Sequence, residues 1–540
     1  MKYPSIIHKE KIIFLFFLSI YFSGLSLSES YGLSWDEGVH RVRGQKTLVY
    51  VCEKLGFIDE ADIPNTLNNY REGIGAKYGP IFDLPAAALE ELFYKDDIRK
   101  AYLMRHKLNW SVYFLGIIFF YLFIKFKFCS TKYAIIGVSI YLFHPRLFAH
   151  GFFNPKDSIL QALIAISLYF ITIAYYKRAL RWFIFSGIII GICISTRVVS
   201  IYIPALFIVL LLFEYIINKQ NGIDNSNTQI KQIICLFSVS LLTLFLTWPI
   251  LWQDTVQSFV NSLSLMSNHF WSGANYFFGE YISAKNIDWY YIPVWILITT
   301  PISFILLLLI GSFIATKNIL YQRWSDETLF ELFLLSGFIV PILSVIILNS
   351  TLYDGWRHLF FLYPFLVYFM VKGFYFSYNL IAEKFKVKPL LVFFSVIFIV
   401  FIEPLYSTFI LHPNQQVYFN FFPGRDPMLK FEGDYWGLSH RQGLDYILKN
   451  DNNQKIKVLC DYGTWNRHLL LKNDKERLLL VPTDVPFDQL NSDNGDYYIT
   501  GFRNRQNNDY IKAKSYMAPY TGEVFSIKIK EMKILGVYKL

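Results

Sequence analysis

The sequence predicts a polytopic α-helical membrane protein that carries a small α/β domain at its C-terminal end. Three observations support this fold class. Hydrophobic residues make up 54% of the 540-residue chain and charged residues only 17%, whereas about a quarter of the residues in soluble domains are charged. The apolar residues form long runs, and short clusters of Lys and Arg separate these runs. After about residue 409 the composition changes to that of a soluble domain.

Eleven apolar runs are long enough for transmembrane helices, because about 20 apolar residues in a helix cross the bilayer core. They lie near residues 12–28, 109–126, 133–149, 158–176, 182–198, 200–217, 232–250, 291–315, 329–349, 359–378 and 389–408. The first run follows Lys9 and Lys11 and also fits a signal peptide. Because many spans follow it and no small-residue cleavage site appears before Ser34, we interpret it as a retained helix.

The basic clusters predict the orientation of the chain, because Lys and Arg are enriched in cytoplasmic loops. With the N-terminus in the cytoplasm, every second connection carries such a cluster. The clusters are Lys2, Lys9 and Lys11; Lys125, Lys127 and Lys132; Lys177, Arg178 and Arg181; Lys219 and Lys231; Lys317 and Arg323; and Lys384, Lys386 and Lys388. We therefore expect a multi-pass protein of the inner (plasma) membrane whose C-terminal end lies outside the cytoplasm.

Two domains follow from this topology. Residues 1–410 form the membrane region, with a large first outer loop at 29–108 and a further outer loop at 250–290. Residues 411–540 form an extracytoplasmic α/β domain, with a helix at 440–449. Its predicted strands are Lys455–Cys460, Arg477–Val481, Tyr497–Gly501 and the run Val524–Leu540.

The outer loops contain amphipathic segments. One helix is expected to begin near Ser34 and another at Asp83, where Pro85 suits a first turn. The loop at 250–290 holds a helical pattern with apolar residues at Val256, Phe259, Leu263 and Met266. Such a helix lies in the membrane interface or packs against the protein's own helices.

Net charge and cysteine use exclude other classes of protein. The formal net charge is +10, which by itself would fit a nucleic-acid partner. The positive residues lie in loops between spans, however, so we expect the lipid bilayer as the partner and no nucleic acid. The five cysteines show neither metal-ligand spacing nor a paired framework.

The first candidate site residues are two adjacent carboxylates, Asp36 and Glu37, just beyond the first span. Two carboxylates at the bilayer surface can supply a general base with a supporting acid, or ligands for a metal ion. Glu37 has a structural alternative, because Ser34 and Glu37 match a capping box in which the glutamate binds the backbone of the cap. A purely structural role fits Asp36 less well.

A second polar group opens the fourth span at Asp157, with Lys156 beside it and His150 shortly before. The helix dipole stabilises a carboxylate at a helix N-terminus, so capping is the structural alternative for Asp157. The density of His, Arg and Lys around it exceeds what a cap requires. We predict that Asp157 takes part in catalysis and that Lys156 and His150 bind substrate.

Two arginines lie at the outer ends of later spans. Arg197 ends a long apolar helix, where a charge is costly and often functional, although a long side chain can also reach water. Arg357 and His358 lie in a compact turn that opens the tenth span. A lone Arg there more often anchors the interface, but Arg also binds phosphate through two parallel hydrogen bonds. Arg197, Arg357 and His358 together favour an anionic ligand.

Carboxylates and cations at a membrane surface suit a substrate with a lipid tail and a phosphate head. Transfer of a sugar from such a lipid needs a base that takes the proton of the acceptor hydroxyl. It also needs cations that stabilise the departing phosphate as negative charge develops. The acidic and cationic residues therefore fit the two tasks of a glycosyltransferase.

The acidic pair in the first outer loop, the further acid in the next one and the many spans resemble the GT-C superfamily of membrane glycosyltransferases. This resemblance covers about residues 10–410. Within this superfamily, the sequence resembles the protein O-mannosyltransferases of glycosyltransferase family 39 and the bacterial lipid A aminoarabinose transferases. The strings Tyr353–Tyr363 (YDGWRHLFFLY), His412–Asn420 (HPNQQVYFN) and Asp434–Arg441 (DYWGLSHR) look like a bacterial branch of family 39.

The resemblance implies an inverting transfer of a hexose or pentose from a polyprenyl phosphate to an acceptor hydroxyl on a protein, lipid or glycan. Asp36 matches the first-loop Asp of the family, the expected base, and Glu37 matches its acidic neighbour. Asp157 matches the acid of the second outer loop. Arg197 falls where relatives have a cation near the lipid phosphate, and we expect Arg357 to be a second one.

The resemblance leaves the acceptor and the metal requirement open. Residues 409–540 do not look like the β-trefoil insertion of eukaryotic mannosyltransferases, and they do not clearly match the aminoarabinose enzymes. Acidic pairs in this superfamily sometimes accompany a divalent metal ion, but the sequence contains no complete ligand set.

Two other classes of function are open. A flippase or transporter of a polyprenyl-linked glycan needs polar residues near mid-membrane and symmetry between halves, and neither is evident. The polar outer loops argue only mildly against a non-catalytic membrane subunit that presents the outer domain to partners. The geometry distinguishes these classes, since an enzyme requires Asp36, Asp157, Arg197 and Arg357 to line one outward cavity.

Overall fold

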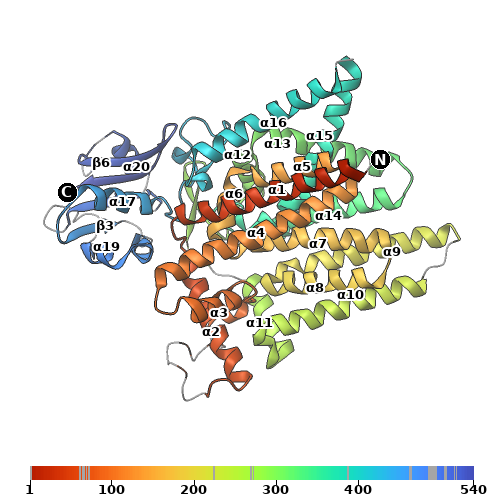
Figure 1. The fold of residues 1–540 in the computed structure, drawn as a ribbon, viewed down its shortest axis with the longest axis horizontal. Coiled ribbons are helices and arrows are strands. Elements are labelled where there is room, and N and C mark those ends of the chain that lie inside the picture. The colour runs from red at the N-terminus through yellow and green to blue at the C-terminus, as the bar shows by residue number, and fades with distance from the viewer. Residues whose placement is uncertain are drawn as a thin grey trace.

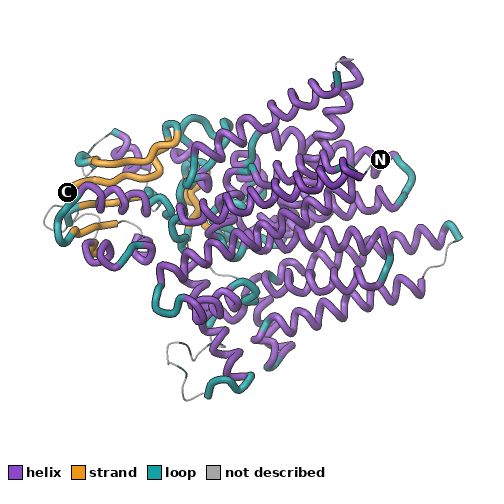
Figure 2. The backbone as a smooth tube through the Cα atoms, in the orientation of Figure 1, coloured by secondary structure: helices purple, strands orange, loops and turns teal. Residues whose placement is uncertain are grey.

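The computed structural model describes residues 3–59, 63, 67, 70, 73–222, 226–267, 271, 273–385, 388–460, 465–483, 495–503, 507–515, 517 and 520–540. Long helices run side by side through most of the molecule, and the strands lie at one end of it (Figures 1 and 2). The basic residues Lys2 and Lys386, which support the predicted orientation, lie outside the described residues.

Among the described residues, nine helices are long and apolar enough to cross a membrane. They are α1 (Tyr3–Leu27), α4 (Ile98–Phe128), α7 (Asp157–Lys177), α9 (Tyr202–Gln220), α10 (Ser226–Thr247), α13 (Ile302–Tyr321), α14 (Asp326–Ile347), α15 (Tyr363–Phe385) and α16 (Pro389–Ile410). Two predicted spans correspond to shorter apolar helices, α5 (Thr131–Leu142) and α8 (Leu180–Thr196). The predicted polytopic helical fold is confirmed, with nine full-length spans in place of eleven.

Prolines divide two of the predicted spans. The run at 133–149 is not one helix, because α5 ends at Leu142 and a separate helix, α6, covers Pro145–Phe153. His144 before the proline is extended (φ −84°, ψ 107°), since a proline disfavours helical backbone in the residue that precedes it. The run at 291–315 divides in the same way into α12 (Tyr291–Thr299) and α13, on either side of Pro301.

Two glycines allow the central helix α15 to pack closely against α13. A Cβ atom on Gly311 would lie 1.8 Å from the Phe369 carbonyl oxygen, and one on Gly373 would lie 2.0 Å from that of Leu307. Inside lipid no hydrophobic effect brings helices together, so their association depends on close packing, which small residues at the crossing allow. The α13–α15 contact therefore requires both glycines.

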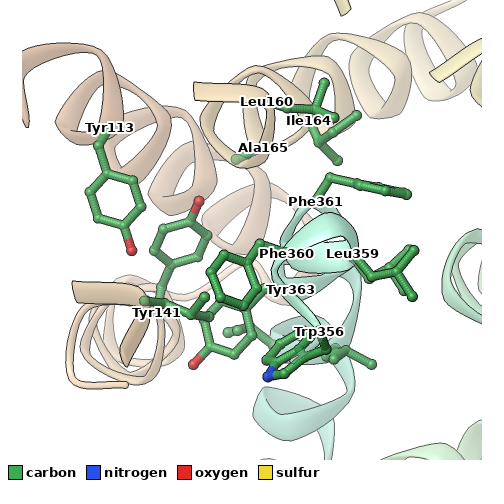
Figure 3. Close-up of a cluster of buried hydrophobic side chains, with 14 of the residues drawn as sticks. Tyr113, Tyr141, Leu160, Ile164, Ala165, Trp356, Leu359, Phe360, Phe361 and Tyr363 are labelled. Carbon is green, nitrogen blue, oxygen red and sulfur yellow. The ribbon is translucent and has the colours of Figure 1, made fainter. Parts of the chain in front are cut away.

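Aromatic side chains fill the bundle directly below the polar end of α15. The 3₁₀ helix η6 (Arg357–Leu362) leads into α15, and Figure 3 shows Trp356, Phe360 and Tyr363 packed beside Tyr141 of α5. The Tyr363 hydroxyl donates a hydrogen bond to the Ile140 carbonyl (2.7 Å). This packing fixes the segment that carries Arg357.

The extramembrane elements gather at one end of the bundle (Figure 1). They comprise α2 (Glu37–Lys54), α3 (Asp83–Phe93), α11 (Thr255–Ser267), the hairpin of β1 (Ala274–Phe277) and β2 (Glu280–Ser283), and the C-terminal domain. The expected amphipathic helix is α11: Phe259 contacts Trp248 (ring centroids 6.4 Å apart), while Val256 is exposed. The side chain of Met266 lies outside the described residues.

The C-terminal domain is built on a mixed five-stranded sheet in the order β4-β3-β5-β7-β6. Strand β3 (Ile456–Cys460) pairs in parallel with β4 (Leu480–Thr483) and β5 (Tyr497–Thr500), and β7 (Met532–Lys539) pairs antiparallel with β5 and with β6 (Glu523–Ile529). The helices are α17 (His440–Asn450), α18 (Trp465–His468), α19 (Asp474–Leu479) and α20 (Asn507–Lys514). The small α/β domain is confirmed.

The predicted strand Arg477–Val481 is wrong at its start. Residues 474–479 form α19, because Asn473 accepts a hydrogen bond from the Glu476 backbone N–H (2.9 Å) while the Glu476 side chain accepts one from Asn473 N–H. This capping box favours helix over strand. Strand β4 begins only at Leu480.

We expect Gly311→Val to destabilise the protein by about 1–3 kcal/mol or more, because added methyl groups overpack a tight helix crossing. Thermal unfolding in detergent would measure the change. The matched control is Phe313→Leu on the same helix, since the Phe313 side chain faces outward. Equal unfolding temperatures for the two variants would contradict the proposed role of the close crossing.

Candidate functional site

The centre of the site is the guanidinium group of Arg357, which binds carboxylates from three separate segments. Its Nη1 lies 3.3 Å from Asp36 Oδ2 and 3.2 Å from Asp157 Oδ2. Its Nη2 and Nε each lie 3.1 Å from Asp354 Oδ2. Residues 36, 157 and 354, which are far apart in sequence, therefore meet on one cation.

Two more arginines balance the charge of these carboxylates. Arg197 Nη2 lies 2.7 Å from Asp157 Oδ1, and Arg197 Nη1 donates to the His358 carbonyl oxygen (3.1 Å). Arg503, from the C-terminal domain, lies 2.7 Å from Asp354 Oδ1. Three arginines thus pair with three carboxylates, which satisfies the requirement that buried charges be paired. We call these six residues the Asp–Arg cluster.

Asp36 is the most accessible carboxylate of the Asp–Arg cluster. Its side chain is 31% exposed, whereas those of Asp157 and Asp354 are 1% and 4% exposed. It directly precedes α2, and its carbonyl oxygen accepts the His40 N–H in the first turn of that helix (3.0 Å). A solvent-facing carboxylate held at a helix start can reach a substrate hydroxyl.

Asn154 fixes Asp157 at the start of α7. Its Oδ1 accepts the backbone N–H of Asp157 (2.9 Å), and its Nδ2 donates to Asp157 Oδ2 (3.1 Å). Asn154 therefore binds the first backbone N–H of α7, and Asp157 lies in the first turn of that helix, as the helix-dipole alternative expects. The Asp157 side chain remains bound to Arg197 and Arg357.

Glu37 lies next to Asp36 in sequence but binds other partners. Its carboxylate accepts from His106 Nε2 (2.8 Å) and from the Ser34 backbone N–H (3.1 Å). Burial raises the pKa of Glu37, and the neighbouring His106 opposes this shift. The Ser34 contact is one half of the predicted capping box, since the Ser34 hydroxyl donates instead to the Phe153 carbonyl (3.0 Å). Glu37 thus connects the start of α2 to α4.

A pocket with cationic and apolar walls adjoins the Asp–Arg cluster. Its lining residues are Tyr78, Lys156, Arg197, Val199, Val345, Ser350, Thr351, Leu352, Tyr353, His358, Leu359 and Phe361. Lys156 Nζ lies 3.5 Å from the centroid of the Tyr78 ring. Burial, followed by the charge of Arg197, lowers the pKa of Lys156 well below its ordinary value. The pocket combines cation donors with the apolar surface that a lipid chain requires. We call it the cationic pocket.

His150 lies behind the Asp–Arg cluster. Its Nδ1 contacts Asn154 Nδ2 (3.0 Å), and its Nε2 contacts the Tyr435 hydroxyl (3.2 Å). The ring packs against Trp436 and Phe360 with centroids 5.0 and 4.8 Å away. Burial lowers the pKa of His150 well below its ordinary value, so the imidazole is neutral. His150 reaches the cluster through Asn154.

Among the residues that the structure describes, no group of three or more His, Cys, Asp or Glu side chains could hold a metal ion. The carboxylates of Asp36 and Asp157 instead share the Arg357 guanidinium. These two carboxylates therefore already have a cation between them.

Three residues near the centre were not selected from the sequence as site residues: Asp354, Arg503 and Glu432. Asp354 belongs to the predicted turn and adopts a left-handed backbone (φ +59°), as does Gly355; an Asp-Gly pair is a recognisable signal for such a turn. Arg503 follows a strand of the soluble domain, and no sequence pattern connects it to a residue 149 positions earlier. Glu432 is buried and accepts the Tyr276 N–H (3.2 Å).

Comparisons with known proteins found a similar sequence profile and similar folds. Residues 108–248 match the sequence profile of the dolichyl-phosphate-mannose-protein mannosyltransferase family. A search of curated proteins by similarity found no match. The structure of ArnT from Cupriavidus metallidurans bound to undecaprenyl phosphate aligns over 97% of each chain, at 12% identity and a TM-score of 0.44. The archaeal oligosaccharyltransferase AglB from Archaeoglobus fulgidus, in complex with an inhibitory peptide and a dolichol-phosphate, aligns over 92% of this chain and 71% of its own, at 11% identity and a TM-score of 0.52.

The fold and the site define a multi-pass membrane protein with a charged cluster at one end of its helices. The structural match with AglB shows the fold alone, and this is the GT-C fold. The resemblance seen in the sequence is confirmed at this level.

We expect the stability of the protein to depend on the protonation of Glu432, because burial raises its pKa from 4.5 to about 7. A raised carboxyl pKa contributes stability that is complete below the unfolded-state value and is lost as the pH rises through about 7. The thermal unfolding temperature should therefore fall between about pH 5 and about pH 8, and Glu432→Gln should reduce this fall.

Unfolding scans at several pH values would measure this effect. The matched control is Glu531→Gln, because Glu531 is a half-exposed carboxylate in the same part of the chain. The same pH dependence in wild type and Glu432→Gln would contradict the expectation.

Proposed function

We propose that the protein is a glycosyltransferase that moves a sugar from a polyprenyl-phosphate donor to an acceptor hydroxyl, with inversion, on the outer face of the membrane. One observation carries the proposal: the accessible carboxylate of Asp36 and the buried one of Asp157 share Arg357, beside a pocket with cationic and apolar walls. This arrangement supplies both a base and an anion site at the end of membrane helices.

In the proposed reaction, Asp36 takes the proton of the acceptor hydroxyl. The hydroxyl oxygen forms a bond to the anomeric carbon of the sugar, and the bond from that carbon to the phosphate oxygen breaks. The electron pair of the broken bond goes to the phosphate. Because the hydroxyl attacks the face opposite the departing phosphate, a single displacement inverts the configuration of the sugar.

The cationic pocket would bind the donor phosphate. The lining of this pocket includes Arg197, Lys156 and the His358 imidazole. Cations placed where negative charge develops stabilise the transition state more than the bound substrate. Lys156 has a strongly lowered pKa, so a bound phosphate would favour its charged form. The apolar side chains of Val199, Val345, Leu359 and Phe361 would contact the first units of the lipid chain.

The comparisons support a lipid-phosphate donor. AglB, which has the same fold, was solved with a dolichol-phosphate, and the matched family profile is that of dolichyl-phosphate-mannose-protein mannosyltransferases. The matched residues 108–248 contain Asp157, Lys156 and Arg197. The proposal leaves the sugar and the acceptor open.

The proposed orientation has the Asp–Arg cluster and the C-terminal domain outside the inner membrane. It rests on the basic loops, since Lys and Arg favour the cytoplasmic side. The N-terminal end of α1, the C-terminal end of α9 and the start of α10 lie at the end of the bundle opposite the C-terminal domain (Figure 1). Polyprenyl-linked sugars presented at the outer surface would then reach the cationic pocket from the bilayer.

Transport of a polyprenyl-linked glycan is a weaker alternative. The described ionisable residues of the Asp–Arg cluster lie at the ends of α7, α8 and α15 rather than at mid-membrane, whereas transporters bind substrates near the midplane. A non-catalytic subunit would not need an accessible carboxylate held beside buried cations.

We expect Asp36→Asn to reduce sugar transfer at least about 100-fold, because an amide cannot accept the proton of the acceptor. Transfer would be measured in membranes that contain the polyprenyl-phosphate sugars of the host. The control is Asp59→Asn, an exposed carboxylate of the same outer loop. Full transfer by a folded Asp36→Asn protein would refute the assignment of the base.

We expect Lys156→Met to weaken the binding of undecaprenyl phosphate about tenfold or more, because a charged hydrogen bond to phosphate is lost. In the wild type, affinity should fall as the pH rises, since phosphate binding requires Lys156 to take up a proton; this dependence should be smaller in the variant. Binding to purified protein at several pH values would measure both effects. The exposed Lys95→Met serves as control, and equal affinities for the two variants would contradict the assignment.

A further inference from the structure

The C-terminal domain contacts the Asp–Arg cluster directly through Arg503. Arg503 follows β5 and lies 2.7 Å from Asp354 Oδ1, while the other oxygen of Asp354 lies 3.1 Å from Arg357. Arg503 also donates a hydrogen bond to the Tyr435 carbonyl oxygen. The Arg503 side chain is only 12% exposed. A buried ion pair thus connects the soluble domain to the centre of the membrane site.

The backbone beside this ion pair is strained at Phe502. Phe502 has φ +62° and Asp354 has φ +59°, which is the left-handed region. For a bulky residue such as Phe this conformation is a genuine outlier and costs about 1–3 kcal/mol. Strain of this kind persists only where the surrounding structure enforces it, and it concentrates at functional sites. Phe502 is buried against Tyr510 and Tyr520, which hold it in place.

Asp354 forms ion pairs with both Arg503 and Arg357. With Arg503 present, Asp354 is shared between two arginines, so Arg357 retains positive charge toward Asp36 and Asp157. Without Arg503, Asp354 would bind Arg357 alone and draw the guanidinium away from the other two carboxylates. A charge this deeply buried interacts strongly with its neighbours because little water screens it.

We propose that Arg503 is a positioning residue through which the C-terminal domain sets the geometry and charge of the catalytic carboxylates by way of Asp354 and Arg357. The inference rests on the proposed function and assigns a task to the domain: the catalytic site is complete only when the domain is docked. Arg503 itself does not touch the substrate.

The test compares purified Arg503→Met, Arg503→Lys, Asp354→Asn and the double variant Arg503→Met/Asp354→Asn with the wild type. The matched control is Arg425→Met, because Arg425 forms an ion pair with Glu531 (3.5 Å) but its side chain is 87% exposed. For each protein, kcat, the KM for the polyprenyl-phosphate sugar, the pH profile of kcat and the thermal unfolding temperature are measured.

The proposal predicts that Arg503→Met lowers kcat about 100-fold, since a misplacement near 1 Å has such an effect, and changes the donor KM little. Arg503→Lys should recover part of the loss. The acidic limb of the pH profile should move to higher pH in Arg503→Met, because loss of a positive charge favours protonated carboxylates. In the Asp354→Asn background, Arg503→Met should have little further effect on kcat. The two effects are not additive because Arg503 acts through Asp354.

Three results would overturn the inference. They are wild-type kcat in Arg503→Met, a loss of activity that only follows the loss of folded protein, and an unmoved pH profile with additive effects in the double variant. The activity of the wild-type enzyme in the same assay distinguishes these three results from a failure of the proposed function. If the wild type transfers no sugar from any polyprenyl-phosphate donor, the proposed function is wrong and the inference falls with it.

Discussion

The Arg357 guanidinium is the interaction on which the rest of the site depends. Removing a charge from water is costly, and a buried charge is tolerated only with close partners of opposite sign. Arg357 obtains them from the segment before α2, from the start of α7 and from its own turn. Each of those segments must therefore dock in register for the cation to be stable. The aromatic packing around Trp356 and Tyr363 holds the guanidinium in the place where all three carboxylates reach it.

The balance of three arginines and three carboxylates also suits the chemistry that we propose. In the resting site the charges cancel, so the buried groups are stable without a ligand. Arg197 and Lys156 face the cationic pocket on one side, and Asp36 is accessible to solvent. The phosphate and hydroxyl groups of the proposed substrates would therefore meet charges that are already in place, and water would not have to reorganise around them. Such preorganised charges are usually the largest single contribution to catalysis.

Hydropathy was sufficient to predict most of the helices and the C-terminal α/β domain, because these depend on local composition. The breaks at Pro145 and Pro301 were missed, since an apolar run does not show where a helix divides. Asp36, Asp157, Arg197 and Arg357 were selected from the sequence, and the structure brings them into one cluster. Glu37 and His150 bind other partners, and Asp354 and Arg503 depend on contacts between distant segments that no local pattern encodes.

The distances along the chain between these partners determine when the site can form during synthesis. Asp36 and Asp157 precede Arg357 by 321 and 200 residues, and Arg503 follows Asp354 by 149. Asp36 emerges from the ribosome long before Arg357, so it must stay hydrated at the bilayer surface while later spans insert, whereas Asp157 can already pair with Arg197. Asp354 gains its second partner, Arg503, only when the C-terminal domain folds. A chain released before Arg357 would therefore leave Asp36 without its counter-ion.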